Sequence, residues 1–529
     1  MAKQPVRFFN TTGPCNPNDH YMLPPEERLI GAQLHRYVSD KLYWVLHAPR
    51  QTGKTTFLKS WMREINCGDE AIACYVSVED CQGVTDRDAA IRTVYYDILD
   101  YARINKMPVP LVEDRDITGL MRSTLIRWAE LVAPKSLIVL FDEVDVLEGE
   151  AMTSFLRQLR GGFADRGIGT FPVSIALVGM RDLKDYITKS KDGATPNPGS
   201  PFNIKSDSAV IGNFSKADTA KLFAQRTEST GQQITGEALD YVWEQSKGQP
   251  WIVNNLFMRA TMRVLEHDDY STVTYEHVFE ARKQMITARE THLDSLAYRL
   301  ENPEVRRVIE TVISGEFNPA VVESEGFRIA IDLGLVTVDN GNPEIANPVY
   351  REIIARQITY STQVMLQNPG WKWQNDDGTL DMDALLREFQ YFWKMNSEEL
   401  EEMSNYTEAF PHILLMAFLQ RVTNGNGRIE REYAAGSGRM DLAVEYNGRW
   451  DIIEVKLWRK YRTYEFVLNE GLTQIRSYRE HLTPIAHRND VSATGAYLVI
   501  FNRRPEAKDM PWDERIGWEL ADDVTVVRC

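Results

Sequence analysis

The feature that most constrains the fold is a loop rich in turn residues, placed between a strand pattern and a helix pattern. Residues 43–47, YWVLH, form a short apolar and aromatic run typical of a strand, and KTTFLKSWMREI from Lys54 has helical periodicity. The loop between them follows the spacing GxxxxGK[ST], except that Ala48 stands at the first glycine position. In such a strand, loop and helix, backbone N–H groups converge at a helix N-terminus and form an anion site. The sequence therefore predicts an α/β fold with a phosphate-binding loop.

The residue types of this loop fit ATP with magnesium. Gly53 lets the backbone approach a phosphate, Lys54 can reach the β- and γ-phosphates, and the Thr55 hydroxyl can ligate Mg²⁺. Ala48 is compatible with this role if its φ is negative. A chance match in an ordinary loop is the alternative, and the flanking strand and helix argue against it. The predicted nucleotide-binding residues of the loop are Ala48, Pro49, Arg50, Gln51, Thr52, Gly53, Lys54, Thr55 and Thr56.

A second motif, SLIVLFDEVDVL, begins at Ser136. Its apolar run suits a parallel strand that is buried on both faces and ends in two acids. Asp142 can hold the magnesium through water, and Glu143 can polarise the attacking water. An acidic helix cap is the alternative interpretation. Together with Thr55, Asp142 is a predicted magnesium ligand.

Two more apolar runs, AIACYVSV from Ala71 and FPVSIALVGM from Phe171, alternate with helical stretches. This alternation predicts a parallel sheet with right-handed crossovers. Arg181 follows the second run directly, where a guanidinium could sense or stabilise the γ-phosphate. An ordinary surface arginine is an equal alternative at this position.

These motifs resemble the AAA-like P-loop ATPases of the additional-strand, catalytic-glutamate class, close to the signal-transduction and archaeal-ATPase branches. The resemblance implies that one strand separates the phosphate-loop strand from the acidic strand, and that a small helical lid follows. In SKGQPWIVNNL from Ser246, the element Gly248-Gln249-Pro250 would begin a lid helix and place Pro250 at the nucleotide. The upstream segment with His20, Tyr21 and Pro24 would lie near the adenine.

We expect five segments in the chain of 529 residues. An ATPase core over 1–214 precedes a helical lid over 215–292, where FSKADTAKLFAQRTE opens on a serine cap. The order helix, helix and two short strands around DNGN resembles a winged helix over 293–362. Its second helix carries both acids and Arg328, which favours contact with a protein partner over direct DNA reading. Pro, Gly and Asn residues indicate a linker over 363–387, before an α/β domain over 388–529.

The last segment contains GRMDLAVEYNGRWDIIEVK, two alternating strands joined by a hairpin turn at YNGR. Asp441 begins the first strand, and Glu454 and Lys456 lie on one face of the second, with Val455 turned into the core. Asp441, Glu454 and the Val455 carbonyl can hold Mg²⁺, with Mn²⁺ as a substitute. Lys456 can orient or deprotonate the metal-bound water. This chemistry suits phosphodiester hydrolysis.

The same segment resembles the PD-(D/E)XK nuclease superfamily, with Asp441 and the EVK tripeptide as its two signature pieces. The resemblance implies an additional metal ligand at Glu408 and a catalytic glutamine at Gln474, in a helix that also carries Tyr478. Met440 departs from the family pattern, which has proline there. Two alternatives stay open: a solvated charged hairpin without a metal, and a retained fold that has lost its activity.

Composition sets limits on these functions. The net charge of −16 argues against a surface that coats nucleic acid throughout, because such binding is dominated by phosphate neutralisation. A local groove remains compatible, since basic and aromatic residues interleave from Lys456 to Tyr464, and Arg503 and Arg504 could extend it. Five cysteines without a CxxC pair indicate neither a disulfide framework nor a zinc site. With neither a membrane span nor a signal peptide in the pattern, we expect a cytoplasmic protein.

The combined prediction is an ATP-controlled nuclease that acts on nucleic acid, with DNA as the expected substrate. The fold-level resemblance associates such a protein with genome maintenance, mobile elements or defence. A homo-oligomer and a protein partner bound through the winged helix are further expectations. The rivals are a regulatory ATP switch, in which the nuclease-like fold only docks a partner, and an oligomeric motor.

Overall fold

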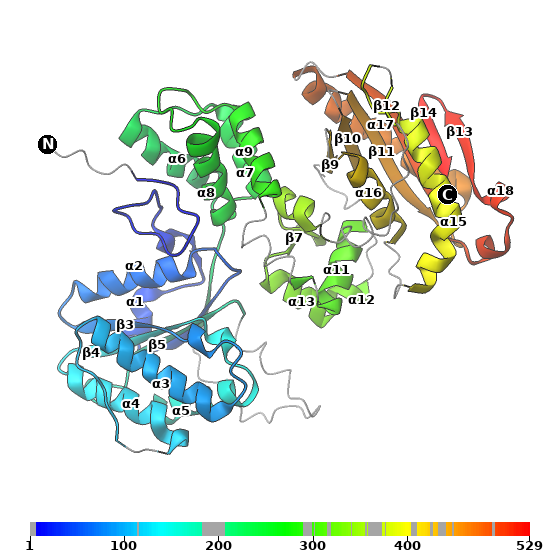
Figure 1. Cartoon of the computed structure of the whole chain (residues 1–529). Coiled ribbons are helices and arrows are strands. Elements are labelled where there is room, and N and C mark those ends of the chain that lie inside the picture. Colours follow the sequence, from blue (N-terminus) through cyan, green and yellow to red (C-terminus); the bar gives the residue numbers. More distant parts are fainter. Residues whose placement is uncertain are drawn as a thin grey trace. The chain divides into compact units, whose positions relative to one another are not determined.

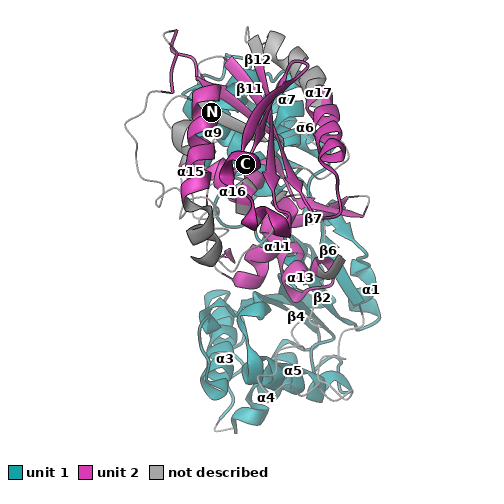
Figure 2. Cartoon of the chain, turned by 90° about the vertical axis from the view of Figure 1, so that its right-hand side faces the viewer, with its two compact units in different colours: residues 1–287, 332–334 teal, residues 288–331, 335–529 magenta. Residues whose placement is uncertain are grey.

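The computed structural model describes residues 7–113, 116–181, 207–288, 299–300, 302–314, 319–339, 341–354, 357, 373–375, 377–403, 410–423, 427–431, 441–446, 449–488 and 492–529. The chain divides into two compact units, which Figure 2 colours separately: residues 1–287 with 332–334, and residues 288–331 with 335–529. The five predicted segments are finer than this division, and their boundaries stay predictions.

Unit 1 is built on a six-stranded sheet in the order β1-β6-β2-β5-β4-β3. Its strands are β1 (Leu29–Ile30), β2 (Tyr43–His47), β3 (Ala71–Ser77), β4 (Ser136–Asp142), β5 (Ser174–Gly179) and β6 (Asp207–Ile211). All neighbours pair in parallel except β1 with β6. One strand, β5, therefore lies between the phosphate-loop strand β2 and the acidic strand β4, as the resemblance implied.

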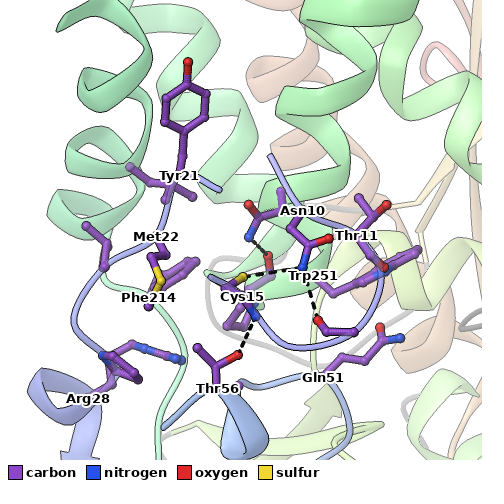
Figure 3. A pocket seen from close by; sticks show the side chains of 17 residues that line it. Asn10, Thr11, Cys15, Tyr21, Met22, Arg28, Gln51, Thr56, Phe214 and Trp251 are labelled. Carbon is purple, nitrogen blue, oxygen red and sulfur yellow. Dashed lines mark hydrogen bonds between the residues drawn. The ribbon is translucent and has the colours of Figure 1, made fainter. Parts of the chain in front are cut away.

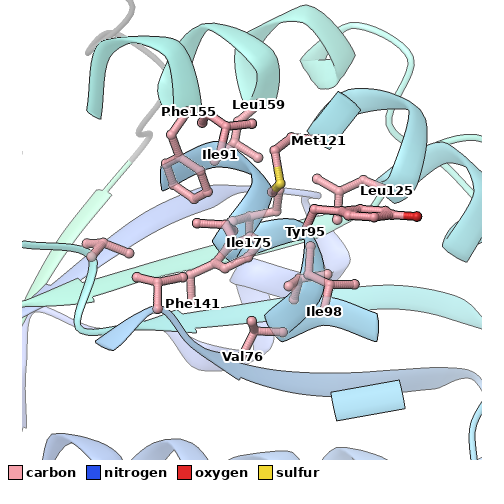
Figure 4. Packing of buried hydrophobic residues seen from close by; sticks show 14 of the residues in the cluster. Val76, Ile91, Tyr95, Ile98, Met121, Leu125, Phe141, Phe155, Leu159 and Ile175 are labelled. Atoms are coloured by element: carbon pink, nitrogen blue, oxygen red, sulfur yellow. The ribbon is translucent and has the colours of Figure 1, made fainter. Parts of the chain in front are cut away.

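Helices cover both faces of this sheet (Figure 1). Side chains alternate along β2, so Tyr43 and Val45 pack toward α3 (Arg87–Ile104), α4 (Ile117–Val132) and α5 (Gly149–Phe163). Trp44 and Leu46 pack on the opposite face with α1 (Leu34–Ser39) and α2 (Lys54–Asn66). Figure 4 shows the first of these cores, where helix side chains close over Val76, Phe141 and Ile175 of three strands. The predicted α/β class with a buried parallel sheet is confirmed for this unit.

A group of helices follows the sheet in unit 1: α6 (Lys216–Thr230), α7 (Gly236–Ser246), α8 (Pro250–Met258), a π-helical segment (Arg259–Val264) and α9 (Tyr275–Thr287). The predicted serine cap is confirmed, because Ser215 and Asp218 form a capping box at the start of α6. At the start of α8, the Gln249 side chain accepts from the Ile252 N–H at 2.7 Å, and Pro250 takes the first helical position. The predicted helix start at Gly248-Gln249-Pro250 is therefore confirmed.

Unit 2 begins with α11 (Pro303–Ser314), α12 (Pro319–Val322) and α13 (Glu325–Asp332), followed by β7 (Val336–Asp339) and β8 (Asn342–Ile345). The last residue of α13, Asp332, is grouped with unit 1. The two strands form an antiparallel hairpin that pairs Asp339 with Asn342, as predicted around DNGN. Helix α15 (Met382–Met403) starts inside the predicted linker 363–387, so residues 382–387 are helical. The helix starts after Asp381, whose carboxylate accepts a hydrogen bond from the Ala384 N–H at 2.9 Å and so caps the helix. The prediction overlooked this cap because the surrounding residues have the composition of a linker.

The rest of unit 2 is a six-stranded sheet in the order β13-β14-β12-β11-β10-β9. Its strands are β9 (Gly427–Arg431), β10 (Asp441–Tyr446), β11 (Arg449–Trp458), β12 (Ser492–Asn502), β13 (Gly517–Ala521) and β14 (Val524–Arg528). The predicted hairpin is confirmed as the antiparallel pair β10–β11, and α17 (Tyr464–Arg488) leads from β11 to its parallel neighbour β12. Helix α17 packs on one face of the sheet, and α15 packs on Phe501 of the other face, beside α16 (Phe410–Thr423). A short helix, α18 (Trp512–Arg515), precedes β13.

Within the described part of the chain, every helix is too short or too polar to traverse a lipid bilayer.

The turn into α8 generates the first prediction. Gly248 has φ +75°, and a Cβ there would lie 1.9 Å from the Phe214 carbonyl oxygen. Gly231 also has a positive φ, +85°, but has open space around it. Gly231→Ala should cost only the left-handed strain of about 1–2 kcal/mol, whereas Gly248→Ala should cost clearly more because backbone must move. Hydrogen–deuterium exchange of α8 and urea unfolding measure both losses, and equal losses would contradict the close approach.

Candidate functional site

The phosphate loop reaches its shape through two left-handed residues. Gly53, immediately before α2, has φ +101°, and Gln51 has φ +58°. Ala48 is not among the residues with positive φ, which confirms the condition for alanine at the first loop position. Its methyl group packs into the core under the loop, and its N–H donates to the Gly179 carbonyl at 3.3 Å. Alanine here adds apolar contact without changing the path of the backbone.

Lys54 points back into the loop. Its Nζ donates to the carbonyl oxygens of Ala48 at 2.8 Å and Pro49 at 3.1 Å. Burial lowers the pKa of this ammonium, and the charges of Glu143, Asp145 and Asp142 oppose that effect. Lys54 is therefore held as a buried cation against carbonyl dipoles, which an anionic phosphate could replace as partners.

The two predicted magnesium ligands meet. Thr55 Oγ1 donates to Asp142 Oδ2 at 2.7 Å, and Asp142 is fully buried. Tyr75 on β3 also donates its hydroxyl to the same oxygen at 3.0 Å. The Glu143 N–H donates to Asp142 Oδ1 at 3.0 Å, and Glu143 itself has a left-handed φ of +58°. A hydroxyl beside a carboxylate is a donor set that Mg²⁺ accepts.

The surroundings of Glu143 change its pKa. Burial raises its pKa, and the nearby charges of Asp145 and Asp142 raise it further. Asp145 Oδ1 is buried and has no hydrogen-bond partner among the described residues. Three acids therefore lie close to the buried Lys54 at this edge of the sheet.

A pocket opens beside the loop, between the upstream segment and the start of α8 (Figure 3). Asn10, Thr11 and Cys15 contribute from upstream; the Cys15 N–H donates to Thr56 Oγ1 at 3.0 Å. Trp251 of α8 donates its ring N–H to the Thr11 carbonyl at 2.9 Å. The upstream segment is thus hydrogen-bonded to both α2 and α8.

Several of the residues predicted to lie near the nucleotide line this pocket, and others do not. Its lining includes the predicted nucleotide-binding residues Gln51, Gly53, Thr56 and Pro250. Tyr21 also lines it, whereas His20 and Pro24 are not among the described residues that do so. His20 instead packs edge-on against Phe8, with its ring centroid 4.6 Å from that of Phe8.

The remaining loop residues support the backbone. Thr52 is buried and its hydroxyl donates to the Pro49 carbonyl at 2.9 Å, while Arg50 is exposed. Arg181 makes an ion pair with Asp332 at 3.3 Å, within unit 1. Its predicted role at the γ-phosphate stays a prediction.

Arg28 is a residue of this site that the sequence reasoning missed. One of its guanidinium nitrogens donates to the carbonyls of Thr52 and Gly212, both at 2.8 Å, and the group stacks over Phe214 at 4.8 Å. Burial lowers its pKa to about 10. Arg28 thus joins the phosphate loop to the segment between β6 and α6. No motif marks it, because its partners are backbone carbonyls distant in sequence.

The predicted metal site of unit 2 is partly described. Asp441 and Glu454 are opposite partners in the β10–β11 ladder, although the Asp441 side chain lies outside the described part. Glu454 is 1% exposed and Lys456 is 7% exposed, and the Lys456 ammonium donates to Glu454 Oε1. Glu454 Oε2 is buried and has no hydrogen-bond partner among the described residues. Val455 is turned into the core, as predicted.

Gln474 belongs to the helix that covers this face. The alternation along β11 puts Glu454 and Lys456 on the face of Ile452, which packs in the α17 core. Gly471 lies against Leu498, the ladder partner of Glu454, since a Cβ there would be 2.5 Å from that leucine. Gln474, one helical turn further, has a buried Oε1 without a partner among the described residues. Glu408 lies outside the described residues, as does the Tyr478 side chain.

Basic and aromatic side chains gather where β11 and β12 end. The Arg504 guanidinium lies 3.5 Å from the centroid of the Trp458 ring, and the Arg503 N–H donates to the Trp458 carbonyl at 2.9 Å. Tyr461 is 93% exposed. Among the described side chains no group of three or more His, Cys, Asp or Glu is arranged to hold a metal, and neither Glu408 nor the Asp441 side chain belongs to that set.

Comparisons with known proteins find similarity at the level of structure. No protein-family model matches the sequence, and no curated protein matches it. A Walker-type ATPase of Pyrococcus abyssi is similar with a TM-score of 0.47 and 13% identity, over 65% of this chain and 99% of that one. The ORC2 protein of Aeropyrum pernix aligns with a TM-score of 0.35 and 14% identity, over 61% and 91%. RuvB of Thermotoga maritima aligns with a TM-score of 0.33 and 12% identity, over 60% and 91%.

Proposed function

We propose that unit 1 binds and hydrolyses ATP with magnesium. The observation that carries the proposal is the meeting of Thr55 and Asp142 at 2.7 Å, beside the buried Lys54 and the acid Glu143. Phosphate loops and acidic strand ends that converge in this way supply a cation, a metal site and a base to one phosphate chain. The pocket between the upstream segment and Pro250 of α8 would receive the nucleoside.

Each residue of the site would have a different role in ATP binding or hydrolysis. The loop N–H groups and Lys54 would bind the phosphates, Lys54 exchanging the Ala48 and Pro49 carbonyls for phosphate oxygens. Thr55 and Asp142 would hold Mg²⁺, which neutralises charge on the β- and γ-phosphates when bound. Glu143 would orient and polarise the attacking water, and Arg181 would respond to the γ-phosphate.

Replacing the base should separate binding from hydrolysis. Glu143→Gln keeps the shape of the side chain but cannot accept a proton, so ATP hydrolysis should fall by about 10²- to 10⁴-fold. ATP affinity, measured by equilibrium binding of a fluorescent analogue, should stay within a few-fold of wild type. Lys54→Ala is the matched control and should lose binding itself. Wild-type turnover in the Glu143 variant would refute the assignment of the base.

The raised pKa of Glu143 predicts the pH dependence of hydrolysis. A glutamate that acts as a base must be ionised, so activity should decline on acidification at a higher pH than an ordinary glutamate would give. Asp145→Asn removes a negative charge that raises this pKa, and the acid limb should move to lower pH. Asp100→Asn, an exposed acid on α3, should leave the limb in place. An unmoved limb in the Asp145 variant would contradict the electrostatic coupling.

For unit 2 we propose metal-dependent phosphodiester cleavage, with DNA as the expected substrate. The specific observation is Glu454, a buried carboxylate with one oxygen bound by Lys456 and the other without a partner among the described residues. A buried unpaired carboxylate oxygen is costly. Mg²⁺ shared with Asp441, the ladder partner of Glu454, would satisfy it, so the residues fit the metal.

The surrounding residues suit that reaction. When bound, the metal would lower the pKa of a water and neutralise the scissile phosphate. Lys456 would orient that water, and Gln474 would hold the helix-side contact with the substrate or the metal shell. Arg504, Trp458 and the exposed Tyr461 would bind a phosphate backbone and stack on bases.

The nuclease proposal is tested by magnesium and manganese titrations on single-stranded DNA, double-stranded DNA and RNA. Asp441→Ala and Glu454→Ala should each reduce cleavage by orders of magnitude, because a magnesium site has few protein ligands to lose. Lys456→Ala should also abolish cleavage but keep metal binding. Glu506→Ala, which changes an exposed acid of unit 2, should behave as wild type. Cleavage that persists in the Asp441 and Glu454 variants would assign it to another site.

The rival function is a regulatory switch in which unit 2 only docks nucleic acid or a protein. An inactive wild type that still binds DNA would favour it. We also propose that the chain forms a homo-oligomer. The segment with α11, α13 and the β7–β8 hairpin would bind a protein partner. Size measurements with and without ATP examine the oligomer.

A further inference from the structure

Asp142 is held by more donors than its predicted metal role requires. Oδ2 accepts from Thr55 at 2.7 Å and from Tyr75 at 3.0 Å, while Oδ1 accepts from the Glu143 N–H at 3.0 Å. Thr55 can keep this bond when a metal binds, because a hydroxyl that offers a lone pair to Mg²⁺ still has its O–H to donate to Asp142. Tyr75 donates to the same oxygen, and nothing in the phosphate-loop motif makes it a metal ligand itself.

Tyr75 and its strand contact both β4 and α2. Strand β3 pairs with β4 so that Ser77 lies opposite Asp142, and the tyrosine two residues earlier reaches along the strand to the carboxylate. The Asn66 side chain, at the end of α2, accepts from the Ala73 N–H at 2.7 Å and donates to its carbonyl at 3.0 Å. The Lys59 ammonium lies 5.1 Å from the centroid of the Tyr75 ring. The backbone beside Tyr75 is thus tied to the end of α2, and the ring lies beside Lys59 of the same helix.

The protonation of Tyr75 suits a donor. A phenol has an ordinary pKa of about 10, so at neutral pH its hydroxyl keeps its proton and donates it. A neutral phenol that donates to a metal-binding carboxylate orients that carboxylate without competing for the ion.

We propose that Tyr75 is a positioning residue for the divalent cation of the nucleotide site. Together with the Thr55 hydroxyl, it holds Asp142 in its metal-binding orientation. This inference rests on the proposed ATP-binding function and adds to it a residue that sets the affinity for the cation. Outer partners of this kind typically change metal affinity by about 10- to 100-fold when removed.

The test measures metal binding directly, on the full-length protein. Binding of Mn²⁺ is followed by electron paramagnetic resonance with and without ADP, and a protein-free titration of the same ADP is subtracted because ADP itself chelates Mn²⁺. The remaining ADP-dependent part isolates the nucleotide site from any metal in unit 2. Tyr75→Phe should weaken that part by about 10- to 100-fold, while ADP affinity in EDTA stays within about twofold of wild type. Tyr43→Phe is the matched control. It removes another buried tyrosine hydroxyl, one that donates to the Pro172 carbonyl at 3.3 Å, and should leave Mn²⁺ binding unchanged.

Two outcomes overturn the proposal. Unchanged ADP-dependent Mn²⁺ affinity in Tyr75→Phe would show that Asp142 is oriented without the phenol. Tyr75→His keeps a ring with an N–H donor and should retain more affinity than Tyr75→Phe, so equal losses in the two variants would assign the effect to packing. If wild type itself shows no ADP-dependent Mn²⁺ binding, the proposed function fails first, which separates that failure from the failure of the Tyr75 role.

Discussion

The hydrogen bond between Thr55 and Asp142 joins two segments that the sequence separates by 87 positions. It is possible because β2, β5 and β4 run parallel, so their carboxyl ends lie on one edge of the sheet. The loop, the acids and the upstream segment all assemble around that edge. A parallel sheet needs helices on both faces to be stable, and the two apolar cores of unit 1 supply this cover.

Both candidate sites contain ionisable groups that are buried at an energetic cost. Lys54 sits against carbonyl oxygens, and Glu454 sits against Lys456 with its second oxygen unsatisfied among the described residues. Replacing such groups with apolar side chains is often neutral or stabilising, so their presence is poorly explained by folding stability. Ligands that complete their coordination, as proposed for both sites, would account for these buried groups.

The local motifs predicted more of this structure than the long-range contacts did. The phosphate loop, the acidic strand end, the β10–β11 hairpin and the start of α8 were predictable, because each is encoded in a few consecutive residues whose chemistry restricts the backbone. Arg28 and Tyr75 were not predictable in this way. Their roles depend on partners in other elements. Neither an arginine among acids nor a tyrosine in a strand belongs to a local sequence motif.

The start of α15 shows the opposite error, since turn-rich composition concealed the Asp381 cap. For the predicted metal site of unit 2, the hairpin register brought Asp441 opposite Glu454 as expected, and the burial of Lys456 was unforeseen. Alternation along a strand predicts which face a side chain occupies. It does not predict that a helix such as α17 covers that face.

The left-handed backbone at Gln51 and Glu143 has a consequence for how this chain can change over time. Neither position is glycine, although glycine adopts this conformation without the steric cost that other residues bear. A selection for thermal tolerance alone would therefore favour glycine at both positions. At 143 that replacement would delete the carboxylate, and at 51 it would delete a side chain from the pocket wall. At either position a change to glycine would thus relieve backbone strain and remove a side chain of the candidate site in a single substitution.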